Sequence, residues 1–255
     1  MHDDAMRLAL LSDIHGNIQA LEACLLHARA QKAQRFAFLG DLVGYGANPV
    51  EVVERVQLMT EEGATVLQGN HDAMAVHPPA DIKTMGESTA HWTHEQLSRA
   101  QRDWLDALPL TEQQDKLLLV HASLDDPHLW RYVYDARAAT ASLDAAAQWL
   151  GVQFVFGGHV HEQSLYFRGS SDHLMKFAPQ PGVAVPVAPH RQWLGTIGSV
   201  GQPRDGNPQA MYALIDTGQW QLTFHRVPYD HYAAAQAIVR AGLPAYLAER
   251  LEKGR

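Results

Sequence analysis

The stretch LALLSDIH, residues 8–15, leads from a short apolar run into two side chains that can bind a metal, Asp13 and His15. Such a run is typical of a strand that is buried on both faces. In open α/β sheets, ligands bind beyond the carboxyl ends of the strands. Because Asp13 and His15 are two residues apart, both side chains leave an extended chain on the same side. The stretch therefore predicts a metal site at the end of the first strand.

The same arrangement recurs along the chain, at residues 36–41, 65–71, 117–121 and 154–161. Each of these segments leads from apolar residues into potential ligands, and a glycine directly precedes several of them, which lets the backbone approach an ion closely. The recurrence predicts one shared crevice. Its imidazole and carboxylate groups, without a thiolate, suit Mn²⁺, Fe, Zn²⁺, Ni²⁺ or Co²⁺. The side chains concerned are Asp13, His15, Asp41, Asn70, His71, His121, His159 and His161.

Apolar periodicity and capping residues predict a β-α-β-α-β arrangement at the start, with strands over 7–13, 35–41 and 64–70. Helical patterns follow over 87–108 and 136–150, and each precedes a further strand. The first 160 residues therefore resemble a layered α/β unit.

The pattern changes after His161, where short alternating segments such as SLYFRG, WLGTIGS, MYALID and QLTFHRV are separated by turns. They predict a second, mostly antiparallel sheet that packs against the first. The Ala-rich tail over 230–251 predicts two helical segments. No linker or repeat divides the chain, so we expect one domain over 1–255.

Composition excludes several classes of protein. Of the 255 residues, 46% are hydrophobic and 19% are charged, which is typical of a globular protein. The net charge of −8 argues against long nucleic acid as a partner. Apolar runs are too short to cross a membrane, and the acidic start lacks the features of a secretory signal, so we expect a cytoplasmic protein without a membrane partner. Cys24 is the only cysteine, which excludes an internal disulfide.

The blocks DIHGN, GDLVGYG, GNHD, VHAS and GGHVH, in that order, resemble the signature blocks of the calcineurin-like metallophosphoesterase superfamily. The later segment GSVGQPRDG, residues 198–206, is similar to the small single-domain prokaryotic phosphodiesterase branch of that superfamily. The resemblance covers most of the chain. It implies an α/β fold in which two packed β-sheets are flanked by helices, in agreement with the pattern of strands and helices above.

The resemblance also implies a dinuclear centre with two divalent metal ions, in which a metal-bound hydroxide attacks phosphorus. Asp41 would bridge the ions. One ion would be held by Asp13, His15, Asp41 and His161, and the other by Asp41, Asn70, His121 and His159.

Three further residues receive roles, the first of them from the same resemblance. His71 would act as a general acid or would stabilise the transition state, and the ordinary near-neutral pKa of histidine suits that task. Asp72 would orient the site by hydrogen bonding. Arg204, in a turn rich in Gly and Pro, would bind a substrate phosphate, and the alternative is an exposed residue of a surface turn.

The expected activity is that of a metal-dependent phosphodiesterase on small or nucleotide phosphodiesters. The alternatives are a phosphomonoesterase, a dinucleoside polyphosphate hydrolase of the same superfamily, and a non-catalytic binding scaffold. Gly44 and Tyr45 occupy the Asp and Arg places of the GDxxDRG motif, which argues against relatives that carry it. Thr196, Ile197 and Ala122 also depart from the branch pattern, and His71 favours an enzyme over a scaffold. The natural substrate, the physiological metal and the oligomeric state stay open.

Overall fold

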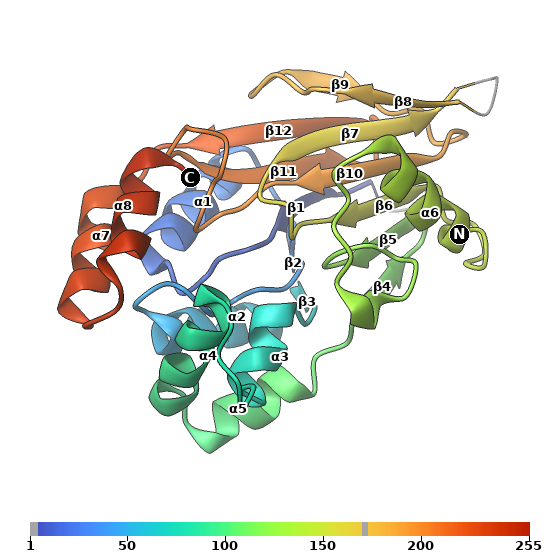
Figure 1. Ribbon diagram of the computed structural model, residues 1–255. Helices are drawn as coiled ribbons and strands as arrows, with labels where there is room; N and C mark the ends of the chain where they lie inside the picture. Colours follow the sequence, from blue (N-terminus) through green and yellow to red (C-terminus); the bar gives the residue numbers. More distant parts are fainter. Residues whose placement is uncertain (1–4, 170–172) are drawn as a thin grey trace.

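The computed structural model describes residues 5–169 and 173–255, and its central layers are two β-sheets packed face to face (Figure 1). The acidic residues at the start of the chain lie outside the described residues. The first sheet has the strand order β3-β2-β1-β11-β12-β9. Its strands are β1 (Arg7–Leu11), β2 (Arg35–Phe38), β3 (Thr65–Val66), β9 (Ala184–Pro186), β11 (Ala210–Asp216) and β12 (Gln221–Val227).

The second sheet has the strand order β4-β5-β6-β10-β7-β8. Its members are β4 (Thr111–Gln114), β5 (Leu117–Val120), β6 (Phe154–Gly157), β7 (Gln163–Arg168), β8 (Leu174–Phe177) and β10 (Trp193–Ile197). Together with the helices, the two sheets confirm the predicted fold class.

Helices flank the paired sheets. The α-helices are α1 (Ile18–Ala30), α2 (Pro49–Glu61), α3 (Asn70–Val76), α4 (Met85–Gln96), α5 (Arg99–Asp106), α6 (Ala136–Ala146), α7 (His231–Arg240) and α8 (Ala245–Lys253), and a short 3-10 helix, η1, spans Pro127–Leu129. Helix α1 begins directly after Asn17, whose side chain accepts a hydrogen bond from the backbone N–H of Ala20 (3.0 Å).

The prediction that the later strands form a sheet of their own is wrong. Strand β11 pairs antiparallel with β1 of the first sheet, and β10 pairs parallel with β6 of the second. Each sheet therefore combines strands from the first part of the chain with strands from the second, and each contains both parallel and antiparallel pairs. Alternation along a strand reports which faces are buried, but it does not specify the partner strand.

Two further predictions, one about a helix and one about a strand, also need correction. The helix expected over 87–108 is divided into α4 and α5, because Leu97 is extended and Ser98 caps α5 by accepting from the backbone N–H of Gln101 (3.2 Å). The strand expected over 64–70 ends at Val66, and α3 begins at Asn70. Asn70 and His71 therefore lie in the first turn of a helix.

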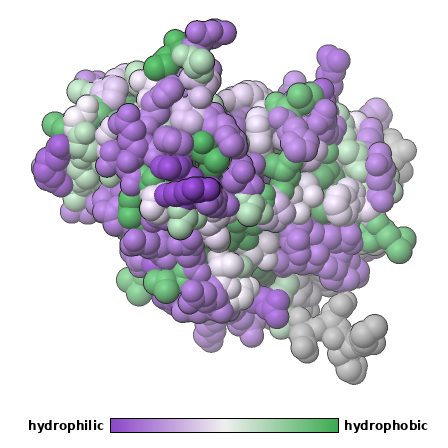
Figure 2. Space-filling view, turned by 90° about the horizontal axis from the view of Figure 1, so that it is seen from below, coloured by the Kyte–Doolittle hydropathy of each residue, from purple (hydrophilic) through white to green (hydrophobic). Residues whose placement is uncertain are grey.

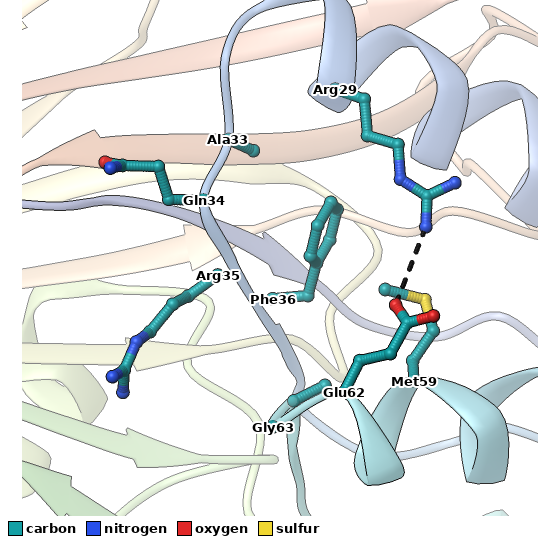
Figure 3. Close-up of a pocket in the computed structure, with 9 residues that line it drawn as sticks. Arg29, Ala33, Gln34, Arg35, Phe36, Met59, Glu62 and Gly63 are labelled. Atoms are coloured by element: carbon teal, nitrogen blue, oxygen red, sulfur yellow. Dashed lines mark ion pairs between the residues drawn. The ribbon is translucent and has the colours of Figure 1, made fainter.

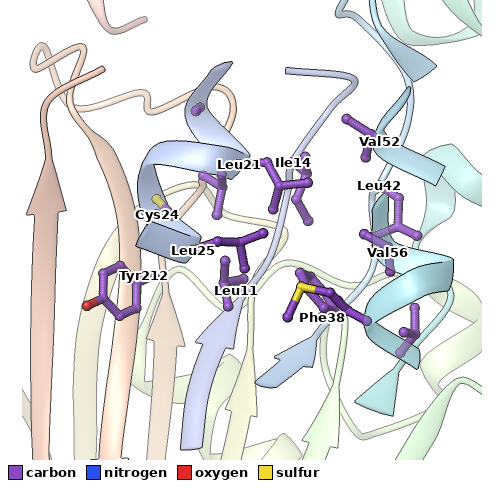
Figure 4. Close-up of a cluster of buried hydrophobic side chains, with 14 of the residues drawn as sticks. Leu11, Ile14, Leu21, Cys24, Leu25, Phe38, Leu42, Val52, Val56 and Tyr212 are labelled. Atoms are coloured by element: carbon purple, nitrogen blue, oxygen red, sulfur yellow. The ribbon is translucent and has the colours of Figure 1, made fainter. Parts of the chain in front are cut away.

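Strand β1 is buried on both faces and lies at the centre of the packing. Leu8 and Leu10 contact the core between the sheets, which includes Phe154 of β6. Leu11 points to the other face, where it packs with Leu25 of α1 (Figure 4). This double burial explains why the sequence of β1 is continuously apolar.

The parallel strands carry the predicted ligands to one region of the molecule. Strands β1, β2 and β3 are mutually parallel in the first sheet, and β5, β6 and β10 are mutually parallel in the second. The carboxyl ends of parallel strands meet at the same edge of a sheet. The segments that follow these strands therefore converge.

The face of the molecule in Figure 2 is mainly hydrophilic, with scattered hydrophobic side chains. Throughout the described ranges, no helix combines the length and the apolar composition that crossing a bilayer requires.

We expect Leu25→Ala to lower the free energy of unfolding by about 2–5 kcal/mol, because it opens a cavity in the core between α1 and β1. Leu25 is fully buried, whereas its neighbour Leu26 on the same helix is 73% exposed. Urea unfolding followed by circular dichroism measures the difference. Leu26→Ala is the matched control and should change stability by less than about 0.5 kcal/mol. Equal effects of the two substitutions would contradict this packing.

Candidate metal centre

The predicted ligands converge into a buried cluster where the two sheets meet. Potential ligand atoms of Asp13, His15 and His161 lie within 4.8 Å of one another, and so do those of Asp41, His121 and His159. Asn70 joins the second group, because its Oδ1 lies 3.3 Å from Nε2 of His121. Every ligand residue predicted from the sequence is therefore present in one site.

The backbone is strained where these side chains are presented. Non-glycine residues with positive φ are uncommon because the Cβ is crowded in this conformation. Such strain is typical of functional sites, where the surrounding structure holds it in place. The ligand residues with positive φ are Asp13 (54°), His15 (49°), Asp41 (54°), His159 (66°) and His161 (57°).

Three of the imidazoles are oriented by backbone carbonyl groups. In each ring Nδ1 donates to a carbonyl oxygen, so that in the neutral imidazole Nε2 carries a lone pair and no hydrogen. The three pairs are His15 with Val43 (3.2 Å), His121 with Leu39 (2.7 Å) and His161 with Gln202 (2.6 Å).

This orientation brings lone pairs together. Nε2 of His15 lies 3.1 Å from Nε2 of His161, although in the neutral rings neither nitrogen carries a hydrogen for the other. Within the described residues, Oδ1 of Asp13 and Nε2 of His159 are buried without a hydrogen-bond partner. Buried polar atoms are normally satisfied. A divalent cation satisfies such atoms, so the residues fit a metal site.

Asp41 lies between the two groups of ligands. Its Oδ2 is 3.7 Å from Nε2 of His15 and 3.3 Å from Nε2 of His121. Its Oδ1 accepts a hydrogen bond from the backbone N–H of His71 (2.8 Å), which holds the carboxylate in place. Although burial by itself raises the pKa of Asp41, the adjacent imidazoles of His121 and His71 hold it well below its ordinary value.

Close backbone packing at Gly158 makes the group of Asp13, His15 and His161 possible. The backbone N–H of His159 donates to Oδ2 of Asp13 (2.9 Å). A Cβ on Gly158 would overlap Oδ2 of Asp13 and Oγ of Ser12. This position therefore requires glycine for close approach.

Asp72 joins two of the loops that carry ligands. Its Oδ1 accepts from the backbone N–H groups of Leu42 (2.8 Å) and Val43 (3.2 Å), and its Oδ2 accepts from that of Gly69 (2.9 Å). The carboxyl group thus fixes the segment after β2 to the start of α3. Burial, followed by the charge of Asp41, raises the pKa of Asp72 to about 7.

His71 is buried beside the cluster. Its ring lies edge-on to His15, with centroids 4.9 Å apart, and 4.5 Å from the ring of Tyr45. Gly44 leaves room for it, because a Cβ there would lie 2.7 Å from Nδ1 of His71. Burial lowers the pKa of His71 to about 4, which differs from the near-neutral value expected from the sequence. The imidazole is therefore neutral at pH 7.

Arg204 approaches the same side of the cluster from the segment after β10. Its guanidinium lies 5.9 Å from the ring centroid of Tyr45, and Nη2 donates to Oε1 of Gln202 (2.9 Å). Gln202 in turn accepts from His161 through its carbonyl group. The segment that was predicted to contact substrate therefore lies next to the candidate ligands.

The aromatic residues around the cluster have little signal in the sequence. Tyr45 contacts His15 and His71, although in the sequence it stands out only as a departure from the GDxxDRG motif. Tyr132 stacks on His159, with centroids 4.0 Å apart and planes 23° apart. Trp130 lies edge-on to His121 at 5.8 Å. For Trp130 and Tyr132, the one signal in the sequence is their position in the loop after His121.

A separate pocket of about 390 Å³ lies at the opposite end of β2, near the first residue of that strand, Arg35 (Figure 3). There Arg29 lies above the ring of Phe36 and 3.9 Å from the carboxylate of Glu62. Asp41 follows the carboxyl end of β2, whereas this pocket lies at the amino end of the same strand. The pocket is therefore separate from the candidate metal centre.

Comparison with known families identifies this arrangement. Residues 6–219 match the model of the calcineurin-like phosphoesterase superfamily domain, which confirms the resemblance inferred from the sequence. The chain is also 30% identical over 254 residues to an uncharacterized protein of Methanocaldococcus jannaschii, covering 97% of this chain and 98% of that protein.

Solved structures agree with this match. A metallophosphoesterase from Sphaerobacter thermophilus superposes with a TM-score of 0.86 at 33% identity, covering 99% of this chain and all of that one. A hypothetical protein from Pyrococcus horikoshii has the same fold, with a TM-score of 0.78 at 20% identity over 98% of both chains.

We expect Mn²⁺ to raise the melting temperature of chelator-treated protein by roughly 5–10 °C at about 100-fold excess over Kd, because bound metal stabilises only the folded state. His161→Ala should lose most of this increase. His128→Ala is the control, because that histidine is exposed and lies outside the cluster. Thermal scanning with elemental analysis measures both effects. An equal Mn²⁺ effect in His161→Ala would exclude this residue as a ligand.

We expect Asp72→Asn to weaken Mn²⁺ binding by about 10- to 100-fold, as is typical when a group that orients ligands is replaced. Asparagine keeps one acceptor oxygen but turns an amide N–H₂ towards backbone donors. Calorimetric titration of Mn²⁺ into the chelator-treated variant measures the change. Wild-type affinity in a folded variant would show that Asp72 has no effect on the centre.

Proposed function

The chain belongs to the calcineurin-like phosphoesterase superfamily, and we propose that it is a metal-dependent hydrolase that cleaves small phosphodiesters, including nucleotide diesters. In this proposal residues 1–255 act as one metallophosphoesterase domain. The observation that carries the proposal is the 3.1 Å approach of Nε2 of His15 to Nε2 of His161, with both rings fixed by carbonyl groups. Two hydrogen-free nitrogens favour a bound cation between them.

We further propose that the centre holds two divalent ions of the group Mn, Fe, Zn, Ni and Co. The position of Asp41 between the two ligand groups supports its role as a bridging carboxylate. When bound, such ions supply Lewis acidity and lower the pKa of water. The proposed ligands are Asp13, His15, Asp41 and His161 for one ion, and Asp41, Asn70, His121 and His159 for the other.

The chain's own residues would bind and orient the substrate around this centre. The fixed imidazole and carboxylate groups would hold the ions, and His71 and Arg204 would position the reacting phosphate beside them, which lowers the entropic cost of reaction. His71 is neutral at pH 7 and has one N–H to donate, so we assign it to stabilisation of a phosphoryl oxygen or of the leaving oxygen in the transition state. Its burial excludes water from that hydrogen bond.

Arg204 would bind a non-bridging phosphate oxygen, since guanidinium groups pair well with phosphate. Its position over Tyr45 leaves the charge on one side of the centre. On the other side an aromatic loop borders His159. The phosphate of a diester carries two organic groups. One could lie beside Arg204 and the other beside the aromatic loop, which supports a diester over a monoester as the substrate.

We expect His71→Ala to lower kcat for bis(p-nitrophenyl) phosphate by about 10²- to 10⁴-fold in Mn²⁺-loaded protein, because the transition state loses a hydrogen-bond donor. Metal content should stay at the wild-type level. The rate is measured by release of p-nitrophenolate, with elemental analysis of the same samples. His128→Ala is the control.

The same assay with p-nitrophenyl phosphate compares diester with monoester. Faster cleavage of the monoester would assign the centre to a phosphomonoesterase. Absence of turnover with either substrate, after loading with each of the five metals, would overturn the hydrolase and favour a non-catalytic scaffold.

A further inference from the structure

A pocket of about 470 Å³ opens beside the candidate metal centre, and its volume is within the range of small-molecule sites. It lies between α3 and the segment that follows β5, and it reaches Asn70 and His159, two of the proposed ligands of the second ion. A phosphate bound at that ion would therefore direct one substituent into this pocket.

The lining of the pocket is suited to a flat aromatic ring. Met74 of α3 lines it together with Trp130 and Tyr132 of the segment after β5. A methionine thioether makes favourable contacts with aromatic rings, and indole and phenol rings stack on planar groups. Trp130 is half-buried and keeps accessible ring surface, whereas the ring of Tyr132, which is 45% exposed, already stacks on the rings of His159 and Tyr134.

The aromatic side of the pocket is held in position before any ligand binds. The backbone N–H of Ser123 donates to the carbonyl of Arg131 (3.1 Å), and Arg131 pairs with the carboxylate of Asp125 (2.6 Å). Val133 is buried against α6. Trp130 has a left-handed backbone, with φ of 49°. A fixed loop reduces the entropy lost when a ligand binds.

We infer that this pocket binds an aromatic ring of the substrate, such as a nucleobase, and so selects aromatic phosphoesters over purely aliphatic ones. The inference rests on the proposed function, because it takes the phosphate to be held at the metal centre. Trp130 is the residue that determines the preference, and Tyr132 and Met74 complete the pocket.

The test is calorimetric titration of Mn²⁺-loaded protein with AMP and with ribose 5-phosphate. These ligands share the sugar phosphate, and only AMP has a base. Stacking of one base on aromatic side chains corresponds to roughly 5- to 100-fold in affinity. We expect AMP to bind at least about tenfold more tightly than ribose 5-phosphate in the wild type, and Trp130→Leu to reduce this ratio to below about threefold.

Two control variants separate the ring from the loop. Trp130→Phe keeps an aromatic ring and should keep most of the preference for AMP. Leu129→Ala alters an exposed neighbour, 53% accessible, that does not line the pocket, and should leave the ratio unchanged. A ratio near one in the wild type, no binding of either ligand, or an unchanged ratio in Trp130→Leu would overturn the inference.

A second pair of ligands tests the wild type alone, so the result does not depend on the folding of any variant. Phenyl phosphate and cyclohexyl phosphate are similar in size but differ in flatness and π character. Tighter binding of phenyl phosphate supports an aromatic site, whereas equal binding would assign the pocket to apolar groups in general and overturn the inference.

Failure of the inference is distinguishable from failure of the proposed function, because binding and turnover are measured separately. If the protein cleaves bis(p-nitrophenyl) phosphate with Mn²⁺ but binds AMP and ribose 5-phosphate equally, the inference about the pocket is overturned and the proposed hydrolase activity stands. If AMP binds much more tightly than ribose 5-phosphate but no turnover occurs, the inference about the pocket stands and the proposed hydrolase activity is overturned.

Discussion

The candidate centre depends on the crowding of buried atoms that have lone pairs and no hydrogens. Backbone carbonyl groups fix Nδ1 of His15 and His161, so their Nε2 atoms face each other at 3.1 Å. The carboxylates of Asp13 and Asp41 add negative charge to the same volume. Such an arrangement is unfavourable in a buried place unless a cation compensates it. The rest of the fold holds these groups together despite their repulsion.

The paired sheets provide the rigidity that this crowding requires. Strand β1 is packed on both faces, so the segment that carries Asp13 and His15 starts from a fixed point. Parallel strands of the two sheets then deliver the other ligands to the same edge. Left-handed backbone conformations at the ligands cost free energy, and burial of the apolar core offsets that cost.

The two sides of the centre differ in chemistry. Tyr45 and Arg204 provide an aromatic ring and a cation next to His71. Trp130 and Tyr132 provide aromatic surface next to His121 and His159. The proposed metal ligands follow strands of the rigid scaffold, whereas these surrounding residues lie on loops. Loops can vary while the scaffold stays the same, so substrate preference in such a fold is decided largely by the loop residues around the centre.

The sequence by itself determined the apolar strands, the candidate ligands that follow them and the family, because each of these is a local pattern of neighbouring residues. It also placed His71 and Asp72 next to a candidate ligand along the chain. Only the tertiary structure decided that β11 joins β1 and that β10 joins β6, since alternation does not specify a partner strand. The lowered pKa of His71 arises from burial among groups distant in sequence. The approach of Trp130 to the centre likewise depends on the folded path of a loop, which no local pattern encodes.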